Sequence, residues 1–184
     1  MINLAQIGCG YWGPNLLRNF NSIENCEVLA VVEPNEGRKS FLNQSFPQVD
    51  IYEDLSSVLN SSTIDAIIIA TPAHLHFEQA KQALLTNKHV FVEKPMATSS
   101  AEVEELSEIA NAKGLTLMSG HTFLYNDAVR FIKNQIDSGE MGEVRYVNAQ
   151  RLNLGRIRSD VDALWNFAPH DVSIIQYLLD DPQP

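Results

Sequence analysis

The amino-acid sequence predicts an α/β protein that begins with a doubly wound parallel sheet. Three observations support this fold class: short apolar segments alternate with amphipathic segments of helical length, a glycine-rich turn follows the first apolar segment, and polar residues follow several of the others. Alternation of this kind joins parallel strands through helical crossovers. The 184 residues are 45% hydrophobic, which is enough to bury a core.

The expected strands are short and rich in aliphatic residues, as strands covered on both faces are. They are residues 2–7, 27–33, 65–71, 89–94 and 115–120. The helices expected between them begin at Pro14, near residue 35, before Ala80 and near residue 99. Pro14 suits a first helical turn, where the amide has no partner. Gly114 is typical of the position just past a helix end.

The pattern changes after Gly120. A helix at 127–138 is followed by 142–153, where alternating side chains predict a longer strand of a second sheet. An amphipathic helix is expected at 171–179. One strand and two helices cannot complete a sheet domain. We therefore expect two domains, residues 1–120 and residues 121–184, the second being the incomplete start of an α/β domain with an open sheet in a chain that is cut short.

The composition argues against several classes of function. The formal net charge is -10, and no basic stripe offsets it, so a nucleic-acid partner is not expected. The longest apolar run, residues 66–70, is too short to span a membrane, and the N-terminus does not have the pattern of a signal peptide. Two cysteines, Cys9 and Cys26, make no disulfide framework. A soluble, cytoplasmic protein without a metal site is the interpretation that fits.

A glycine motif lies between the first expected strand and the first expected helix. Gly8, Gly10 and Gly13 have the spacing G-x-G-x-x-G. In this context the first glycine permits a tight turn, the second lets the backbone approach a pyrophosphate, and the third lets the helix pack against the strand. The helix N-terminus adds free N–H groups. The motif therefore predicts a dinucleotide site, although glycines that only turn the chain are the alternative.

An acidic residue follows the second expected strand, about 20 residues after the motif, as in dinucleotide-binding units. This residue is Glu33, whose carboxylate can accept both hydroxyls of the adenine ribose. Because it would repel a 2′-phosphate, NAD is favoured over NADP as the cofactor. Arg38 lies nearby in the sequence and can accommodate a 2′-phosphate, which keeps NADP as an alternative. Otherwise Glu33 would only cap the next helix.

Further polar residues leave later strands at the carboxyl edge of the sheet, where ligands bind in such folds. Lys94 follows one strand within "FVEKPMA", and Pro95 prevents that strand from continuing. His170, expected at the start of the last helix, can move a proton near neutral pH. Alone, each would be a solvated or quietly packed residue. The preceding strand end adds Thr71, Pro72 and His76.

Together the glycine motif, "TPAHLH", "NKHVFVEKP" and the helix at "PHD" resemble the glucose–fructose oxidoreductase / inositol dehydrogenase / MocA family over essentially the whole chain. The resemblance implies an N-terminal Rossmann domain and a C-terminal α/β domain with a large open sheet. It implies oxidation or reduction of a hydroxyl carbon of a sugar, cyclitol or nucleotide sugar with NAD(P). It also implies a small-molecule substrate and a homo-oligomer at full length, with family members close to twice as long as this chain.

The resemblance also implies roles for individual residues. Lys94 would hydrogen-bond the reacting oxygen and touch the nicotinamide ribose, and His170 would be the acid/base. The family often has an aspartate four residues before this histidine, whereas this sequence has Asn166, which cannot take a proton. That difference argues against a three-residue proton relay but leaves Asn166 on the substrate side. The implied cofactor residues also include Tyr11, Trp12, Thr71, Pro72, His76 and Glu93.

The substrate is suggested by residues 155–171, which resemble family members that act on nucleotide sugars, with C3 as a candidate carbon. Arg156 and Arg158 would bind phosphate groups there, or else lie in a solvated loop. Two other functions are open. One is a family-like glycoside hydrolase that keeps NAD bound during transient oxidation and elimination. The other is a non-catalytic NAD-binding module or truncated product.

Overall fold

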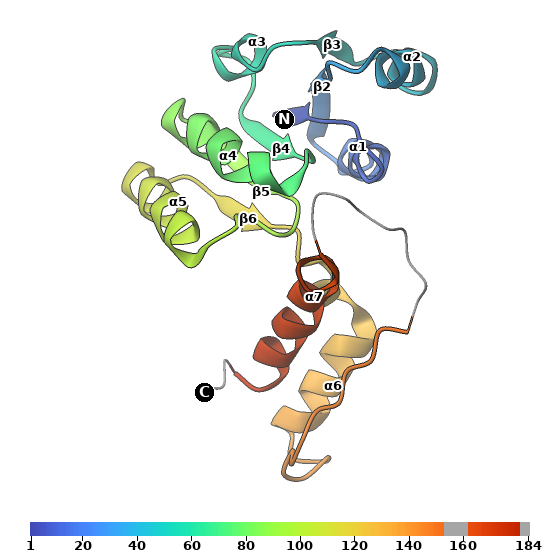
Figure 1. The fold of residues 1–184 in the computed structure, drawn as a ribbon, viewed down its shortest axis with the longest axis vertical. Coiled ribbons are helices and arrows are strands. Elements are labelled where there is room, and N and C mark those ends of the chain that lie inside the picture. Colours follow the sequence, from blue (N-terminus) through green and yellow to red (C-terminus); the bar gives the residue numbers. More distant parts are fainter. Residues whose placement is uncertain (153–161, 181–184) are drawn as a thin grey trace. The chain divides into compact units, whose positions relative to one another are not determined.

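A computed structural model describes residues 1–152 and 162–180, apart from the side chain of Ala163 (Figure 1). The chain divides into two compact units, Met1–Gly120 and His121–Pro184. The first unit contains the whole sheet, and the described elements of the second are helical. Among the described residues, no helix combines the length and the apolar character that crossing a membrane requires.

The first unit is built on a six-stranded sheet in which every pair of neighbouring strands is parallel. The strand order is β3-β2-β1-β4-β5-β6, so the chain starts in the middle of the sheet and extends it in both directions. This confirms the predicted doubly wound fold. The strands are β1 (Ile2–Ile7), β2 (Cys26–Val32), β3 (Asp50–Tyr52), β4 (Ala66–Ile69), β5 (His89–Val92) and β6 (Leu117–Ser119).

Helices cover both faces of this sheet (Figure 1). One face carries α1 (Gly13–Asn21) and α2 (Glu36–Ser45), and the other carries α3 (Ser56–Leu59), α4 (His76–Leu85) and α5 (Ser100–Lys113). A short 3-10 helix, η1 (Ala73–Leu75), precedes α4. Ile67 and Ile69 of β4 pack in the cluster with α4 and α5, whereas Ile68 packs in the cluster with α1 and α2. The all-apolar sequence of β4 thus reflects burial on both faces.

Local sequence signals account for several helix ends. The Ser99 hydroxyl accepts a hydrogen bond from the Glu102 amide at 3.3 Å and begins α5. Gly114 ends the same helix with a φ of 65°, in the left-handed region that favours glycine. Pro14 lies in the first turn of α1, as expected. Because these residues fix where the helices begin and end, they also fix where the loops to the neighbouring strands begin and end.

The second unit contains η2 (Thr122–Tyr125), α6 (Asp127–Asp137) and α7 (Ala163–Leu178). The Asn126 side chain begins α6 by accepting a hydrogen bond from the Ala128 amide at 2.9 Å. The ammonium of Lys133 on α6 pairs with Asp137 at 2.7 Å and with Asp180, just after α7, at 2.6 Å. Two ion pairs and a hydrogen-bonded cap therefore help to define this helical unit.

Two predictions for the second unit are wrong. No strand forms in residues 142–152, where Tyr146 and Leu152 are exposed. A strand must share its N–H and C=O groups with a neighbour, and the described part of this unit offers no second strand. The last helix begins at Ala163 rather than at residue 171, because Asp162 accepts a hydrogen bond from the Trp165 amide at 2.8 Å. Pro169 therefore lies inside α7.

The core of the first unit yields a direct test at two adjacent leucines of α4. Leu84 is 0% exposed and Leu85 is 52% exposed. We expect Leu84→Ala to lower the free energy of unfolding by about 2–5 kcal/mol, because it leaves a cavity between α4 and the sheet. Leu85→Ala should change that free energy by no more than about 0.5 kcal/mol. Urea denaturation of both variants measures the difference, and equal losses would contradict the packing described.

Candidate functional site

The predicted site residues of the first unit follow the carboxyl ends of its strands. In a parallel sheet these ends share one edge, where ligands bind. β1 and β4 lie side by side at the centre of the sheet, although β2 and β3 separate them in the sequence. The loops after them therefore meet at the point where the strand order reverses, which is the usual ligand crevice of such sheets.

The three glycines of the motif differ in how closely the protein packs around them. Gly8 has a φ of +83°, and a Cβ there would lie 2.7 Å from Cγ2 of Thr71. A Cβ on Gly13 would lie 3.0 Å from Nε2 of Gln6. A Cβ on Gly10, in contrast, would meet only the Ala70 oxygen, at 4.0 Å. Packing within the protein thus explains Gly8 and Gly13 but not Gly10, whose open side suits the close approach of a ligand.

Gln6 holds the glycine loop from inside the protein. Its side chain is 0% exposed, and its Nε2 donates hydrogen bonds to the carbonyl oxygens of Gly8 at 2.8 Å and Gly13 at 3.3 Å. The two ends of the loop are therefore fixed to one another. Sequence reasoning missed this residue, although a lone amide side chain inside the apolar strand "INLAQI" is a signal that could have found it.

Glu33 holds the same loop from the end of β2. Only 7% of Glu33 is exposed. Its Oε2 accepts a hydrogen bond from the Cys9 amide at 2.8 Å, and its Oε1 accepts one from the Asn35 amide at 2.9 Å. Each carboxylate oxygen can accept a second hydrogen bond, so capacity for a ribose hydroxyl remains. The helix cap considered as the alternative role belongs to Asn35, whose side chain accepts from the Arg38 amide.

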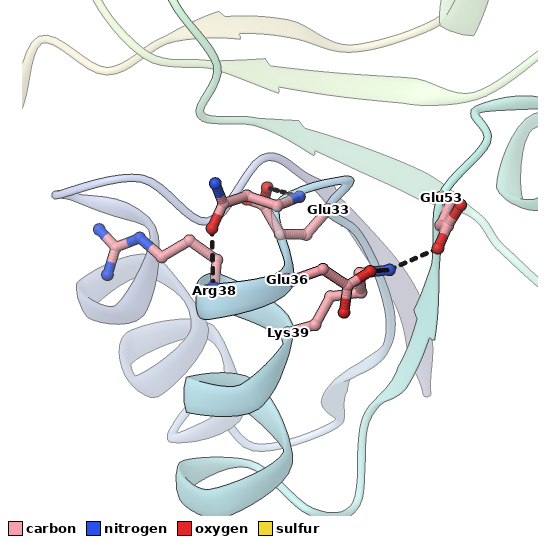
Figure 2. A network of polar contacts seen from close by, with 6 residues as sticks. Glu33, Glu36, Arg38, Lys39 and Glu53 are labelled. Carbon is pink, nitrogen blue, oxygen red and sulfur yellow. Dashed lines mark hydrogen bonds and ion pairs between the residues drawn. The ribbon is translucent and has the colours of Figure 1, made fainter.

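The two basic residues at the start of α2 point in different directions (Figure 2). Lys39 pairs with Glu36 and Glu53, whereas Arg38 extends away from them. Burial raises the pKa of the Cys9 thiol to about 11, and the nearby Arg38 charge opposes that rise. The Arg38 charge therefore acts on Cys9 of the glycine loop, and its role in cofactor choice stays a prediction.

The three predicted site residues that follow β4 differ in burial. Pro72 is exposed and Thr71 is half-buried, with its hydroxyl donating to Oε1 of Gln79 at 2.6 Å. His76 is only 1% exposed. Its Nδ1 lies 2.7 Å from the Pro95 oxygen and its Nε2 lies 2.9 Å from the Thr71 oxygen. The His76 ring therefore lies between two backbone carbonyl oxygens, and its place in the cofactor cleft stays a prediction.

The turn after β5 carries Glu93, Lys94 and Pro95, and the Lys94–Pro95 peptide bond is cis. Lys94 is half-buried, and its amide donates to Oε2 of Glu93 at 3.2 Å. The Glu93 carboxyl lies against Gly120, where a Cβ would come within 3.2 Å of it. Burial raises the pKa of Glu93, while the Lys94 amide and charge and the Trp12 side chain oppose the rise.

The two aromatic residues of the glycine loop face outward. Tyr11 and Trp12 are both exposed, and Trp12 precedes the first residue of α1 without capping it through its side chain. Aromatic rings at the mouth of a loop of this kind offer a flat apolar surface to a ligand. The Trp12 side chain also acts on the Glu93 carboxyl, and contact of both rings with a cofactor stays a prediction.

In the second unit, His170 lies inside α7, with Asn166 one turn before it. The His170 ring meets the Phe123 ring edge to face, with a centroid distance of 4.9 Å. The guanidinium of Arg151 lies 5.2 Å from the same Phe123 ring. It also binds Asp171 through two hydrogen bonds, at 2.9 and 3.0 Å. Sequence reasoning missed Arg151 and Phe123, which fix the surroundings of His170. Arg156 and Arg158 lie outside the described residues.

Comparison with known proteins assigns the first unit to a described family. A family model for an oxidoreductase family with an NAD-binding Rossmann fold matches residues 2–121. The 2,7-anhydro-N-acetylneuraminate hydratase of Escherichia coli is 30% identical over 151 residues, which cover 82% of this chain and 40% of the hydratase. The inositol 2-dehydrogenase of Salmonella typhimurium is 27% identical over 180 residues, which cover 95% of this chain and 54% of the dehydrogenase.

A solved structure is also similar to this chain. A 3-ketoreductase variant from Actinomadura kijaniata, in complex with TDP-benzene and NADP, is 30% identical with a TM-score of 0.72. The match covers 78% of this chain and 44% of the ketoreductase. The chain thus spans about half the length of these relatives, between 40% and 54%.

The raised pKa of Glu93 predicts a pH-dependent effect on stability. A carboxyl whose pKa rises on folding holds its proton more tightly in the folded state, so its ionisation weakens the fold as pH rises above 4.5, its ordinary pKa. We therefore expect Glu93→Gln to gain stability relative to the wild type between about pH 4 and about pH 7. Urea unfolding at both pH values measures this gain. Glu104→Gln, at an exposed position of α5, is the control, and a pH-independent difference for Glu93→Gln would contradict the assignment.

Proposed function

Because the chain belongs to the Gfo/Idh/MocA oxidoreductase family, we propose that it is the cofactor-binding part of an NAD-dependent dehydrogenase. The reaction transfers a hydride between the nicotinamide and a hydroxyl carbon of a sugar or nucleotide sugar. In this proposal residues 1–120 bind the cofactor, and residues 121–184 begin the substrate domain. The observation that carries the proposal is the open side of Gly10, in a loop whose other glycines are enclosed by protein.

The residues of the glycine loop fit the adenosine diphosphate half of NAD. The loop is held from two sides, by Gln6 and by Glu33, so its amides are arranged before a ligand arrives. The N-terminus of α1 adds N–H groups that favour a pyrophosphate. Glu33 keeps acceptor capacity for the adenine ribose hydroxyls and would repel a 2′-phosphate. NAD is therefore the proposed cofactor, and Arg38 is the residue through which NADP would bind instead.

NAD bound at this edge supplies C4 of the nicotinamide as the hydride acceptor or donor. The protein's part is to bind, orient and polarise. Lys94 leaves β5 at the same edge as the glycine loop, and its ammonium is proposed to donate a hydrogen bond to the reacting oxygen. Negative charge develops on that oxygen during oxidation, so a fixed cation there lowers the barrier.

His170 is proposed as the group that takes the hydroxyl proton in oxidation and returns it in reduction. Its imidazole has the acid–base range for this step near neutral pH. Arg151 neutralises the neighbouring Asp171 through two hydrogen bonds, and Phe123 packs against the His170 ring, so the orientation of that ring is restricted. Asn166, one helical turn away, is proposed to hydrogen-bond the substrate without exchanging a proton.

The substrate class is proposed from the relatives and from residues 155–171. The name inositol 2-dehydrogenase favours a cyclic polyol, and the ketoreductase complex with TDP-benzene and NADP favours a nucleotide sugar that reacts at C3. Arg156 and Arg158 would then bind the diphosphate as bidentate donors. We favour a nucleotide sugar, because two arginines lie so near the proposed acid/base histidine in the sequence.

A second candidate function is favoured by the relative named as a hydratase. A family member of that kind suggests chemistry without net redox change, such as a glycoside hydrolase that keeps NAD bound. The cofactor site would be the same, and Lys94 and His170 would again act on a hydroxyl carbon and its proton. The two functions differ in whether free NAD is consumed in proportion to substrate.

A pair of glycine variants tests cofactor binding. Gly10→Ala should weaken NADH binding by at least about tenfold, because its methyl group would occupy the approach of the pyrophosphate. It should leave the free energy of unfolding within about 0.5 kcal/mol of the wild type, since the new Cβ would meet only the Ala70 oxygen, at 4.0 Å, without a clash. Energy transfer from Trp12 and Trp165 to NADH measures affinity, with NADPH as the comparison.

Gly114→Ala is the matched control, because Gly114 has a positive φ of 65° and lies just past α5. It should lose roughly 1 kcal/mol of stability and keep its affinity for NADH. NADH affinity that is unchanged in Gly10→Ala, or absent from folded wild-type protein, would refute the proposed cofactor site.

A further inference from the structure

We propose that His76 is a positioning residue that connects the loop after β4, where Thr71 packs on Gly8, to the turn carrying Lys94. The ring joins two loops that leave neighbouring strands, β4 and β5, and so sets the place of Lys94 at the nicotinamide end of the site. This inference rests on the proposed function, because it concerns the same lysine and the same cofactor. It is a separate role from the cofactor contact expected of His76.

The contacts of His76 are with backbone on both sides. Nδ1 lies 2.7 Å from the carbonyl oxygen of Pro95, and Nε2 lies 2.9 Å from that of Thr71. A neutral imidazole donates from one nitrogen only, whereas an imidazolium donates from both. In either state the ring occupies the space between the two loops and is 1% exposed. Any hydrogen bond that a protonated ring nitrogen donates to one of these oxygens is therefore shielded from competing water.

Three contacts fix Thr71, and one of them is with His76. Its Cγ2 packs so closely on Gly8 that a Cβ there would lie 2.7 Å away. Its hydroxyl donates to Gln79, and its carbonyl oxygen faces His76. On the other side of the ring, the Pro95 carbonyl belongs to the residue after Lys94. An unbroken set of contacts thus runs from the glycine loop through His76 to the turn of the lysine.

Packing of α4 does not require a histidine at this position. The helix is already held by Ala80, Ala83 and Leu84, which are buried in the core between α4 and the sheet. A buried polar ring is costly unless it is hydrogen-bonded, and an aliphatic side chain would fill the same space without that cost. The feature that distinguishes histidine here is its two opposed nitrogens, which reach two carbonyl oxygens at once.

The test compares two ligands that share only the adenosine diphosphate part. ADP contacts the glycine loop and Glu33, whereas NADH also reaches the turn of Lys94. If His76 positions Lys94, His76→Ala should weaken NADH binding by about tenfold, the equivalent of one net hydrogen bond, and change ADP binding little. Lys94→Ala should give the same pattern, and adding His76→Ala to it should cause little further loss.

Two conservative variants separate the two contacts. The side-chain amide of asparagine can occupy the place of Nδ1 and that of glutamine the place of Nε2, so His76→Asn keeps the bond to Pro95 and His76→Gln keeps the bond to Thr71. We expect His76→Asn to recover NADH affinity to within about threefold of the wild type and His76→Gln to recover less. His74→Ala, at the exposed histidine before α4, is the matched control and should resemble the wild type.

Several outcomes would overturn the inference, and one would refute the proposed function. Equal weakening of ADP and NADH in the His76 variants would overturn the inference, because it would indicate only a structural role. An unchanged NADH-to-ADP ratio, or recovery by glutamine without recovery by asparagine, would also overturn it. Wild-type protein that binds neither ligand would refute the proposed function first. If His76→Ala does not fold, the asparagine and glutamine variants decide the question.

Discussion

The candidate site depends on buried polar side chains that hold the backbone of the loops at the carboxyl edge of the sheet. Gln6, Glu33 and His76 are each at least nine-tenths buried, and each binds backbone groups of loops that follow strands. The loops carry N–H and C=O groups that neither strands nor helices satisfy, so buried donors and acceptors must satisfy them. The apolar core sets the positions of the strands, and these three side chains set the positions of the loops between them.

A buried polar side chain also holds a loop at the amino edge of the sheet, where no ligand site is predicted. The ammonium of Lys88, just before β5, donates to the carbonyl oxygens of Ser61 and Ile64 at 2.6 and 2.7 Å. These two bonds fix the loop between α3 and β4, which has no glycine motif. At the carboxyl edge, in contrast, the glycine loop is held from behind and remains open beside Gly10. A held loop with an open face binds a ligand without a large ordering cost, which is the advantage of preorganisation.

Much of the fold could be predicted from the sequence, because the signals involved are local. Five of the six strands and the glycine loop follow from apolar runs and glycine spacing, and Pro14 and Gly114 mark helix ends. β3 has three residues and pairs only with β2 at the sheet edge, so it has no apolar run to reveal it. The strand expected at 142–153 has the alternating pattern but no neighbour in the described chain, and pairing is a tertiary property.

The roles of buried polar residues were harder to predict than their presence. Glu33 could be placed beside a ribose, but its bonds to the Cys9 and Asn35 amides depend on how the loops after β1 and β2 meet. His76 reads as a cleft residue in the sequence because it follows Thr71 and Pro72, yet the turn into α4 buries its ring. The N-terminal start of α7 was missed because Pro169 suggests a helix boundary, whereas Asp162 supplies an earlier cap.

If the loops are fixed before any cofactor arrives, hydrogen exchange of their backbone amides is already slow in the free protein. The backbone amides of Cys9 and Asn35 donate to a buried carboxylate in the free protein. Measured residue by residue by NMR, both should exchange far more slowly than amides of an unstructured peptide, and NADH should add little protection. Exchange at the peptide rate without NADH, followed by strong protection on its addition, would contradict the account, because it would mean that the cofactor and not Glu33 orders the loop.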